Sequence, residues 1–288
     1  MLDLRLKHNV LDAYSMYMHT FDFDYVKVLI ADLYNNGFTL NKQGQLFYSS
    51  DFVPLLLNYE LLFVRHGETY GNCGQVKADG VIDRQMVVEN KKDSNQRIFQ
   101  GNVNNEINQL TTLGWEQAKK LVPALEGYLS NNWIPDVIFY SPLKRARDTA
   151  LPFVEKNNFH DRFIKLDSLR EMSFGAWDNR RVCDFKRNDL CHQFYQEHNA
   201  LVKKSGVNGN GEYEEGENFV ELLLRAKQVL IDLNAKYANQ KILMFSHSMF
   251  GAASKFLLGK GQEVEKHGHL AFDGAYILPC ATPISLWI

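Results

Sequence analysis

The sequence predicts an α/β protein, a three-layer α/β/α sandwich with a mostly parallel central sheet, plus a small N-terminal α+β extension. Apolar runs at 61–64, 133–140 and 241–245 are typical of buried strands. Amphipathic segments at 111–129 and 218–234 have helical spacing and lie ahead of the second and third strands. Strands that alternate with helices favour a parallel sheet with helices on both faces.

The 288 residues fit one large domain with an extension. We place an N-terminal extension of unknown role at 1–58 and the main domain at 59–288. Within the extension, helical spacing predicts a helix at Tyr25–Tyr34. A turn around Gln43-Gly44 predicts a hairpin at 39–48, and Ser50-Asp51 could cap a short helix beginning near Phe52. Its many Phe, Tyr and Leu residues predict a packed segment. Shaping a pocket, forming a dimer and binding a partner all stay open as roles.

Other elements of the main domain follow from local signals. Thr111 is expected to cap the first long helix, and a further helix is expected to start at Ser141 with Pro142 in its first turn. A polar surface loop at 73–99 is long enough to suggest a functional role. The remaining expectations are a short strand at 80–88, a mixed polar region at 173–215 with a flexible stretch at 206–211, a helix at 251–258, and strands at 275–278 and 283–288.

Composition excludes several classes of protein. A net charge of −2 argues against charge-driven nucleic-acid binding. The N-terminus lacks a secretory signal, and no apolar stretch approaches the roughly 18 residues of a membrane span, so a cytoplasmic protein without membrane contact is expected. The scattered cysteines are expected to be reduced thiols rather than a disulfide framework or a zinc site. They are Cys73, Cys183, Cys191 and Cys280.

Polar residues follow each of the three apolar strands. The first strand leads into Arg65-His66, the second into a segment containing Arg145, and the third into Ser246-His247. Parallel strands would bring these ends to one pocket, where two arginines and two histidines favour an anion with several oxygens, such as phosphate. The fixed charge of Arg65 disfavours the imidazolium form, so His66 is expected to be neutral and nucleophilic near pH 7.

These residues belong to a set of motifs that resembles the histidine phosphatase superfamily, also called phosphoglycerate mutase-like. The resemblance covers about 61–288, leaves 1–58 uncovered, and is closest to the phosphatase branch. The matching segments are Arg65-His66-Gly67-Glu68-Thr69 with Asn72, Phe99-Gln100-Gly101, Leu110-Thr111 with Gly114-Trp115-Glu116-Gln117-Ala118, Ser141-Pro142-Leu143-Lys144-Arg145-Ala146, Leu169-Arg170-Glu171 with Phe174-Gly175-Ala176-Trp177, Glu215-Gly216-Glu217-Asn218, and Ser246-His247.

The resemblance implies a metal-independent phosphomonoesterase that needs no cofactor. His66 would form a phosphohistidine, and Glu171 would protonate the leaving oxygen and then activate water. A bound phosphate dianion would raise the pKa of Glu171 and the arginines would lower it, so the balance stays open. The implied phosphate-binding residues are Arg65, Arg145 and His247, with Asn72, Thr69 and Gln100 as secondary contacts. Ser248 replaces a glycine common in the family, which either narrows the pocket or adds a hydroxyl contact.

Two other functions stay open. A phosphoglycerate mutase would use the same phosphohistidine, and a non-catalytic protein would only bind a phosphorylated ligand. Glu68 is interpreted as a structural hydrogen-bonding residue rather than the acid. The expected ligand is a small phosphate ester, with a phosphoprotein as the alternative, and the loops at 73–99 and 178–215 are expected to set specificity. The substrate and the oligomeric state are not readable from the sequence.

Overall fold

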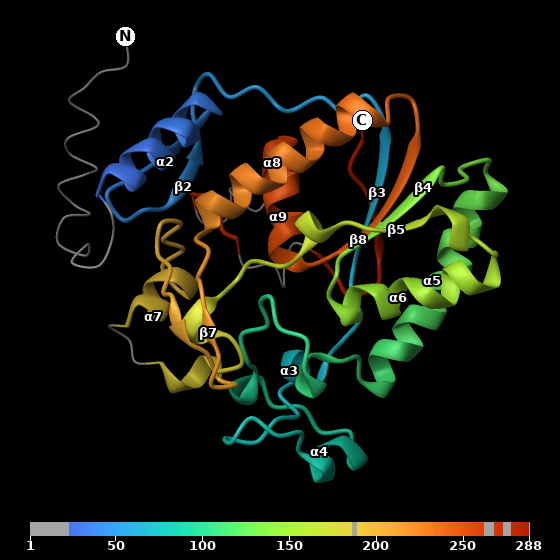
Figure 1. The fold of residues 1–288 in the computed structure, drawn as a ribbon, viewed down its shortest axis with the longest axis horizontal. Helices are drawn as coiled ribbons and strands as arrows, with labels where there is room; N and C mark the ends of the chain where they lie inside the picture. Colours follow the sequence, from blue (N-terminus) through green and yellow to red (C-terminus); the bar gives the residue numbers. More distant parts are fainter. Residues whose placement is uncertain (1–22, 186–188, 262–267, 273–277, 288) are drawn as a thin grey trace.

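The central sheet has the predicted parallel core. The computed structural model describes residues 23–185, 189–261, 268–272 and 278–287. A five-stranded sheet runs in the order β5-β4-β8-β3-β9, parallel throughout except for the edge strand β9 (Figure 1). Its strands are β3 (Glu60–Arg65), β4 (Val137–Tyr140), β5 (Phe163–Lys165), β8 (Lys241–Ser246) and β9 (Pro283–Ser285). The three predicted apolar strands are therefore neighbours, with β8 between β4 and β3.

Helices and short hairpins surround this sheet. The described helices are α2 (Phe23–Asn35), α3 (Tyr70–Cys73), α4 (Arg84–Val88), α5 (Thr112–Ser130), α6 (Lys144–Lys156), α7 (Leu190–Tyr195), α8 (Phe219–Lys236) and α9 (Ser248–Leu257). The described short strands outside the sheet are β1 (Phe38–Leu40), β2 (Leu46–Tyr48), β6 (Gly206–Val207) and β7 (Tyr213–Glu214). The described 3-10 turns are η1 (Ser94–Gln96), η2 (Glu106–Asn108), η3 (His160–Arg162), η4 (Asp167–Leu169), η5 (Gly175–Trp177) and η6 (Val182–Asp184).

The side chains of each strand point alternately to the two faces of the sheet, which divides the core into two layers. Phe63 of β3 packs in a cluster with side chains of α8 and α9, whereas its neighbour Val64 packs with side chains of α5 and α6. Successive side chains of a strand point to opposite faces, so each strand supplies both layers. This arrangement confirms the predicted three-layer α/β/α sandwich, with α8 and α9 on one face and α5 and α6 on the other (Figure 1).

The N-terminal segment packs on the α8–α9 face. The predicted helix is confirmed as α2, and Leu33 of α2 and Phe38 of β1 are fully buried in the same cluster as Phe63. The predicted hairpin is confirmed as the antiparallel pair β1–β2. The expected helix near Phe52 is wrong, because residues 52–57 have no regular secondary structure. Pro54 disfavours helical backbone in the residue before it, and the Leu55 amide donates to Leu257 O outside the segment.

Two expected elements differ from the structure where a short polar side chain accepts backbone hydrogen bonds. One has the wrong type and the other begins later than expected. The segment 80–88 holds α4 rather than a strand, because Asp83 accepts from the amides of Gln85 and Met86 and caps a helix. The helix expected at Ser141 begins at Lys144. The Ser141 amide continues the sheet by donating to Phe245 O, and its hydroxyl oxygen accepts from the Leu143 amide.

Three further expectations concern the second half of the chain. The helix expected at 251–258 begins earlier, at Ser248. The stretch at 206–211 belongs to the β6–β7 hairpin, held where the Gly209 amide donates to Asp178 O at 2.7 Å. The strand expected at 283–288 is the shorter β9, and the strand at 275–278 lies outside the described residues except for Leu278.

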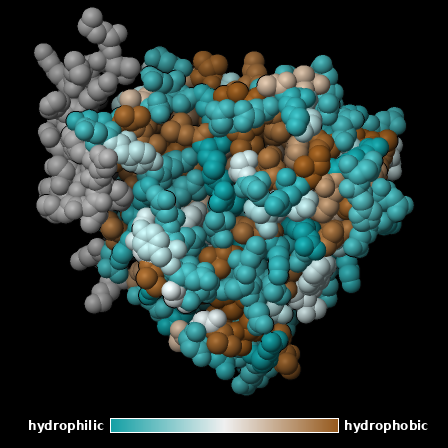
Figure 2. Space-filling model, in the orientation of Figure 1, coloured by the Kyte–Doolittle hydropathy of each residue, from teal (hydrophilic) through white to brown (hydrophobic). Residues whose placement is uncertain are grey.

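The surface is mixed rather than uniformly polar. Figure 2 shows hydrophilic residues interrupted by small hydrophobic areas, one of them at the end of the molecule where Figure 1 places α4. Val88 of α4 is 86% exposed, and Val81 just before it is 55% exposed. No helix among the described residues combines the length and apolarity that crossing a bilayer requires.

Candidate active site

Two histidines meet at the carboxyl ends of neighbouring strands. His66 follows β3 and His247 follows β8, and their ring centroids lie 5.2 Å apart. Nε2 of His247 lies 2.7 Å from the hydroxyl oxygen of Ser141, which follows β4. Residues after three adjacent parallel strands therefore form one cluster, as the sequence predicted.

His66 is oriented as a neutral imidazole. Its Nδ1 lies 2.8 Å from the carbonyl oxygen of Gly67, and because a carbonyl only accepts, Nδ1 carries the proton and Nε2 keeps a lone pair. Burial, then Arg145, then Arg65 hold the pKa of His66 well below its usual range. The neutral form agrees with the sequence expectation, although burial is the larger cause and Arg145 acts ahead of Arg65.

The two arginines are anchored by backbone carbonyls. Arg65 donates from NH1 to Leu278 O at 3.0 Å. Arg145 is completely buried and donates to Val103 O at 3.2 Å and to Gly101 O at 2.7 Å, and burial lowers its pKa to about 10. No described carboxylate pairs with either guanidinium within ion-pair distance. Their charge is therefore left for a ligand.

Glu171 lies against the first turn of α9. Its Oε1 accepts from the Met172 and Phe250 amides at 3.0 and 3.3 Å, and its Oε2 accepts from the Met249 amide at 3.2 Å. Oε2 also lies 3.3 Å from the Ser248 hydroxyl, so the serine adds a hydroxyl contact. Burial raises the pKa of Glu171, against the amide hydrogen bonds and the arginines. The balance left open in the sequence thus lies on the side of a raised pKa.

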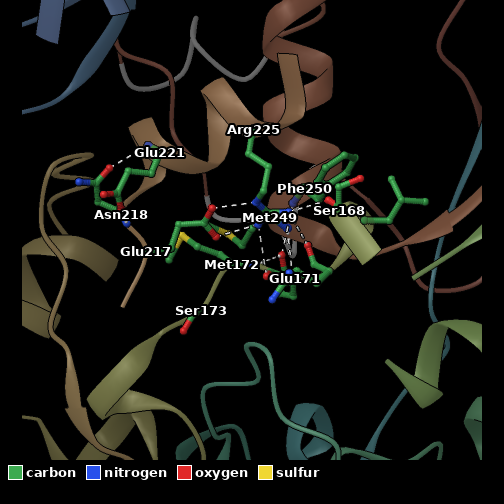
Figure 3. A network of polar contacts seen from close by, with 12 residues as sticks. Ser168, Glu171, Met172, Ser173, Glu217, Asn218, Glu221, Arg225, Met249 and Phe250 are labelled. Carbon is green, nitrogen blue, oxygen red and sulfur yellow. Dashed lines mark hydrogen bonds and ion pairs between the residues drawn. The ribbon is translucent and has the colours of Figure 1, made fainter. Parts of the chain in front are cut away.

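A mostly buried ion pair lies behind Glu171 (Figure 3). Arg225 of α8 donates to both carboxylate oxygens of Glu217, at 2.8 and 2.7 Å. The same guanidinium donates to the carbonyl oxygens of Ser168 and Arg170 at 2.8 and 3.0 Å, and to that of Glu171 at 3.4 Å. Figure 3 shows these bonds converging on the backbone that carries Glu171. The helix α8 thereby fixes the position of the carboxyl group.

Glu68 and Thr69, just before α3, and Gln100 form hydrogen bonds that link several segments around the site. Thr69 caps α3 by accepting from the Asn72 amide, and its hydroxyl donates to Gln100 Oε1 at 2.7 Å. The Gln100 amide nitrogen donates to Ile107 O at 3.2 Å. Glu68 accepts from Lys92 and from Thr111, which agrees with its interpretation as a structural residue.

A pocket opens beside these residues. Five of the predicted site residues line it, namely Arg65, His66, Asn72, Gln100 and Glu171. Thr69, Arg145 and His247 are not among its lining residues. The rest of the lining is Arg97, Ile98, Phe99, Phe174, Val182, Phe194, Tyr195, His198, Ser248, Met249 and Phe272. The pocket therefore joins a cationic side to an aromatic side.

Unsatisfied polar atoms gather at this site. Eight buried side-chain nitrogen or oxygen atoms among the described residues have no hydrogen-bond partner. Four of these belong to predicted phosphate-binding residues, and they are Arg65 Nε, Asn72 Oδ1, Arg145 Nε and His247 Nδ1. Buried polar groups are nearly always hydrogen-bonded, so these four atoms are available to bind a ligand. No cluster of three metal-binding side chains occurs within the described part of the chain.

Comparison with known proteins gives the family. A model of the histidine phosphatase superfamily (branch 1) matches residues 61–263. The chain belongs to the histidine phosphatase superfamily. This superfamily typically reacts through a phosphohistidine, and the chain is a phosphatase-type hydrolase, as the motifs predicted.

Relatives of this histidine phosphatase include proteins named as phosphatases. The mannitol-1-phosphatase of Eimeria tenella is 35% identical over 269 residues, covering 85% of this chain and 80% of the relative. Phosphoserine phosphatase 1 of Hydrogenobacter thermophilus is 28% identical over 134 residues, covering 46% of this chain and 58% of the relative. A crystal structure of phosphoserine phosphatase from Entamoeba histolytica with 3-phosphoglyceric acid has a TM-score of 0.50 at 17% identity, covering 79% of this chain and 89% of that one. The structural likeness shows the shared fold.

Sequence reasoning missed several residues of this histidine phosphatase site. Arg225 lies in the middle of α8, where its spacing gives no sign of a contact with Glu217. Ser141 was interpreted as a helix start, although it contacts His247. His198 has no motif around it and lines the pocket through tertiary packing alone. Only Ser141 carried a usable signal, since it directly follows an apolar strand.

Proposed function

We propose that the chain is a phosphomonoesterase in which His66 carries the phosphoryl group. The observation that carries the proposal is the set of unpartnered buried atoms on Arg65, Asn72, Arg145 and His247 beside a neutral His66. Phosphoryl transfer depends mainly on positioning and on stabilising charge at the phosphoryl oxygens. A rotated Asn72 amide presents a donor in place of its acceptor, so all four residues can donate to a phosphate.

In the first step, Nε2 of His66 attacks phosphorus with its lone pair. The bond between phosphorus and the ester oxygen breaks, and protonated Glu171 gives its proton to that oxygen. The products are a phosphohistidine and a free alcohol. The Gly67 carbonyl supports this step, because its hydrogen bond with Nδ1 keeps Nε2 unprotonated and stabilises the positive charge that develops on the ring.

In the second step, the Glu171 carboxylate takes a proton from water. The water oxygen attacks phosphorus, the bond between phosphorus and Nε2 breaks, and inorganic phosphate leaves. His66 regains its lone pair and Glu171 is again protonated, so the cycle closes without a metal. The backbone amides around Glu171 and the nearby arginines favour its ionised form between the two steps.

The substrate is proposed to be a small phosphate ester. The relative from Eimeria tenella is named a mannitol-1-phosphatase, which makes polyol phosphates the first esters to test. The Arg97 side chain also lines the pocket and has no hydrogen-bond or ion-pair partner among the described residues. Its charge could bind the carboxylate of a substrate, so phosphoserine is the second ester to test. A phosphoprotein remains the alternative. The free cysteines support a reducing compartment, and we propose a cytoplasmic location, which cell fractionation would test.

The test is phosphate release from mannitol 1-phosphate, phosphoserine, p-nitrophenyl phosphate and 3-phosphoglycerate, with and without a chelator. The variant His66→Ala is compared with His160→Ala, which changes an exposed histidine far along the chain. Release by wild type and His160→Ala alone, unaffected by the chelator, supports the proposal. Activity retained by His66→Ala would refute the phosphohistidine. Conversion of 3-phosphoglycerate without phosphate release would instead identify a mutase.

A further inference from the structure

The aromatic side of the pocket is a continuous set of ring contacts. We call Phe99, Phe174, Phe194, Phe272 and His198 the aromatic wall. Successive ring centroids along it lie 5.0, 5.9, 5.2 and 5.5 Å apart, starting at Phe99 and ending at His198. All five side chains line the pocket that also contains Arg65 and His66. An ester bound by its phosphate on the cationic side would extend its remaining atoms along this wall.

One end of the aromatic wall is built outside the common family region. Phe272 follows the last residue of the family match, which ends at 263. His269, in the same segment, lies with its Nε2 3.0 Å from Nδ1 of His198. His198 itself adopts a left-handed backbone with φ of 54°, an uncommon conformation for a residue with a side chain. This end of the wall therefore depends on support from neighbouring elements.

The turn of the β1–β2 hairpin holds the segment that carries His198. Gln45 donates from Nε2 to the carbonyl oxygen of Glu197 at 3.1 Å. The Ala200 amide donates to Gly44 O at 2.9 Å. Gly44 has a φ of 75°, which is available to glycine without strain and turns its carbonyl toward Ala200. Hydrogen bonds from the turn thus lie on both sides of His198.

The second strand of the hairpin holds the segment that carries Phe272. The Leu270 amide donates to Leu46 O at 2.7 Å. The ring of Phe47 packs edge-on against His269, with centroids 6.3 Å apart. The hairpin lies before residue 61, so it too is outside the family match.

We propose that the β1–β2 hairpin determines which leaving groups the pocket accepts, by positioning the His198–Phe272 end of the aromatic wall. The inference rests on the proposed function, because it needs an ester whose phosphate binds beside Arg65 and His66. The wall suits a leaving group with a carbon skeleton of several atoms, whose C–H surface packs on the rings. Gln45 and Phe47 act as positioning residues, since each reaches the pocket only through Glu197 or His269.

The experiment compares Gln45→Glu with Gln43→Glu. Gln45→Glu keeps the side-chain shape but sets a carboxylate oxygen against Glu197 O, whereas Gln43 lies in the same turn, is exposed, and has no side-chain hydrogen bond in the described structure. For the best ester of the panel above, loss of the bond should raise KM about fivefold in Gln45→Glu with kcat unchanged. The inhibition constant of inorganic phosphate should not change, because phosphate alone does not reach the wall. Gln43→Glu should match wild type.

A second variant and a second readout keep the proposal testable. Phe47→Leu should raise the same KM and leave phosphate inhibition unchanged, even if Gln45→Glu folds poorly. Hydrogen exchange at the Ala200 and Leu270 amides should speed up in both variants. Equal changes in KM and in phosphate inhibition, or unchanged KM and exchange in an active enzyme, would overturn the proposal. If the wild-type protein hydrolyses no ester, the proposed phosphomonoesterase function is itself refuted, and the proposed role of the hairpin with it.

Discussion

Arg225 and Glu217 form a two-bond ion pair that holds the backbone on which Glu171 is placed. The Glu171 carboxyl group is not hydrogen-bonded to either residue, and Arg225 instead binds carbonyl oxygens of the 168–171 segment. Both side chains are about four-fifths buried, at 21% and 18% exposure. Screening by solvent is therefore weaker than for a surface pair.

Glu217→Gln should lower kcat/KM by about tenfold, because a small displacement of a catalytic group strongly reduces rate. The neutral amide keeps the shape but leaves Arg225 without its charge partner. Steady-state kinetics across pH would measure the loss of kcat/KM. The alkaline limb of the pH profile should also move, and a general loss of packing would not move it. Glu126→Gln, at an exposed pair with Lys156, is the matched control and should match wild type.

The pH profile should be bell-shaped. His66 must be neutral to attack, and its lowered pKa means that activity falls only well below pH 6.5. Glu171 must be protonated in the first step, and its raised pKa extends activity to higher pH before the alkaline limb begins. The rate should therefore rise with pH through the pKa of His66 and fall through that of Glu171.

Glu171→Gln should remove the alkaline limb and lower the rate on an alkyl ester by about 10²- to 10⁴-fold. With p-nitrophenyl phosphate, which needs little help from an acid, the variant should release a burst of nitrophenolate and then turn over slowly. Stopped-flow absorbance would detect the burst. Equal losses on both esters, with no burst, would argue that Glu171 is not the proton donor.

Ser141→Ala should weaken phosphate binding through His247. The Ser141 hydroxyl fixes the ring at Nε2, leaving the buried Nδ1 for a ligand, and burial holds the pKa of His247 well below its usual range. Loss of one such bond should raise the inhibition constant of inorganic phosphate about fivefold. Ser130→Ala changes an exposed serine of α5 and is the control. An unchanged inhibition constant would contradict a role for His247 in binding phosphate.

Gly251→Ala should destabilise the protein by about 1–3 kcal/mol through overpacking. An added Cβ would lie 2.2 Å from Leu278 Cδ1 and 2.8 Å from the Phe63 ring. Gly127→Ala is the opposite case, since nothing lies within 4 Å of its added Cβ, and it should stabilise the helix α5 by about 0.5–1 kcal/mol. Urea unfolding of both variants would measure these changes. Because Leu278 O binds Arg65, Gly251→Ala should also weaken phosphate inhibition.

Much of this site could be predicted because its signals are local. Arg65, His66 and His247 directly follow apolar runs, so strand order and polarity together place them at one edge of the sheet. The same reasoning failed at 84–88, where the capping side chain of Asp83 outweighed a strand-like pattern. Short elements are decided by one or two hydrogen bonds, which periodicity does not reveal.

The residues that could not be predicted depend on long-range contacts. Gln45 meets Glu197 across 152 positions of sequence, and His198 meets His269 across 71. No local pattern encodes such a meeting, because each partner reaches its place through packing of a separate element. The aromatic wall could not be predicted for the same reason.

The edge strand β9 has a consequence for how the enzyme is made. It pairs with β3, where Val64 meets Pro283, and the nearby Leu278 carbonyl holds the Arg65 guanidinium. Synthesis runs from the N-terminus, so Arg65 and His66 leave the ribosome long before these partners exist. A nascent chain can therefore build most of its core and still lack a complete phosphate site. Catalytic competence should arrive abruptly, with the emergence of the segment from Leu278 to Ser285 rather than in proportion to chain length.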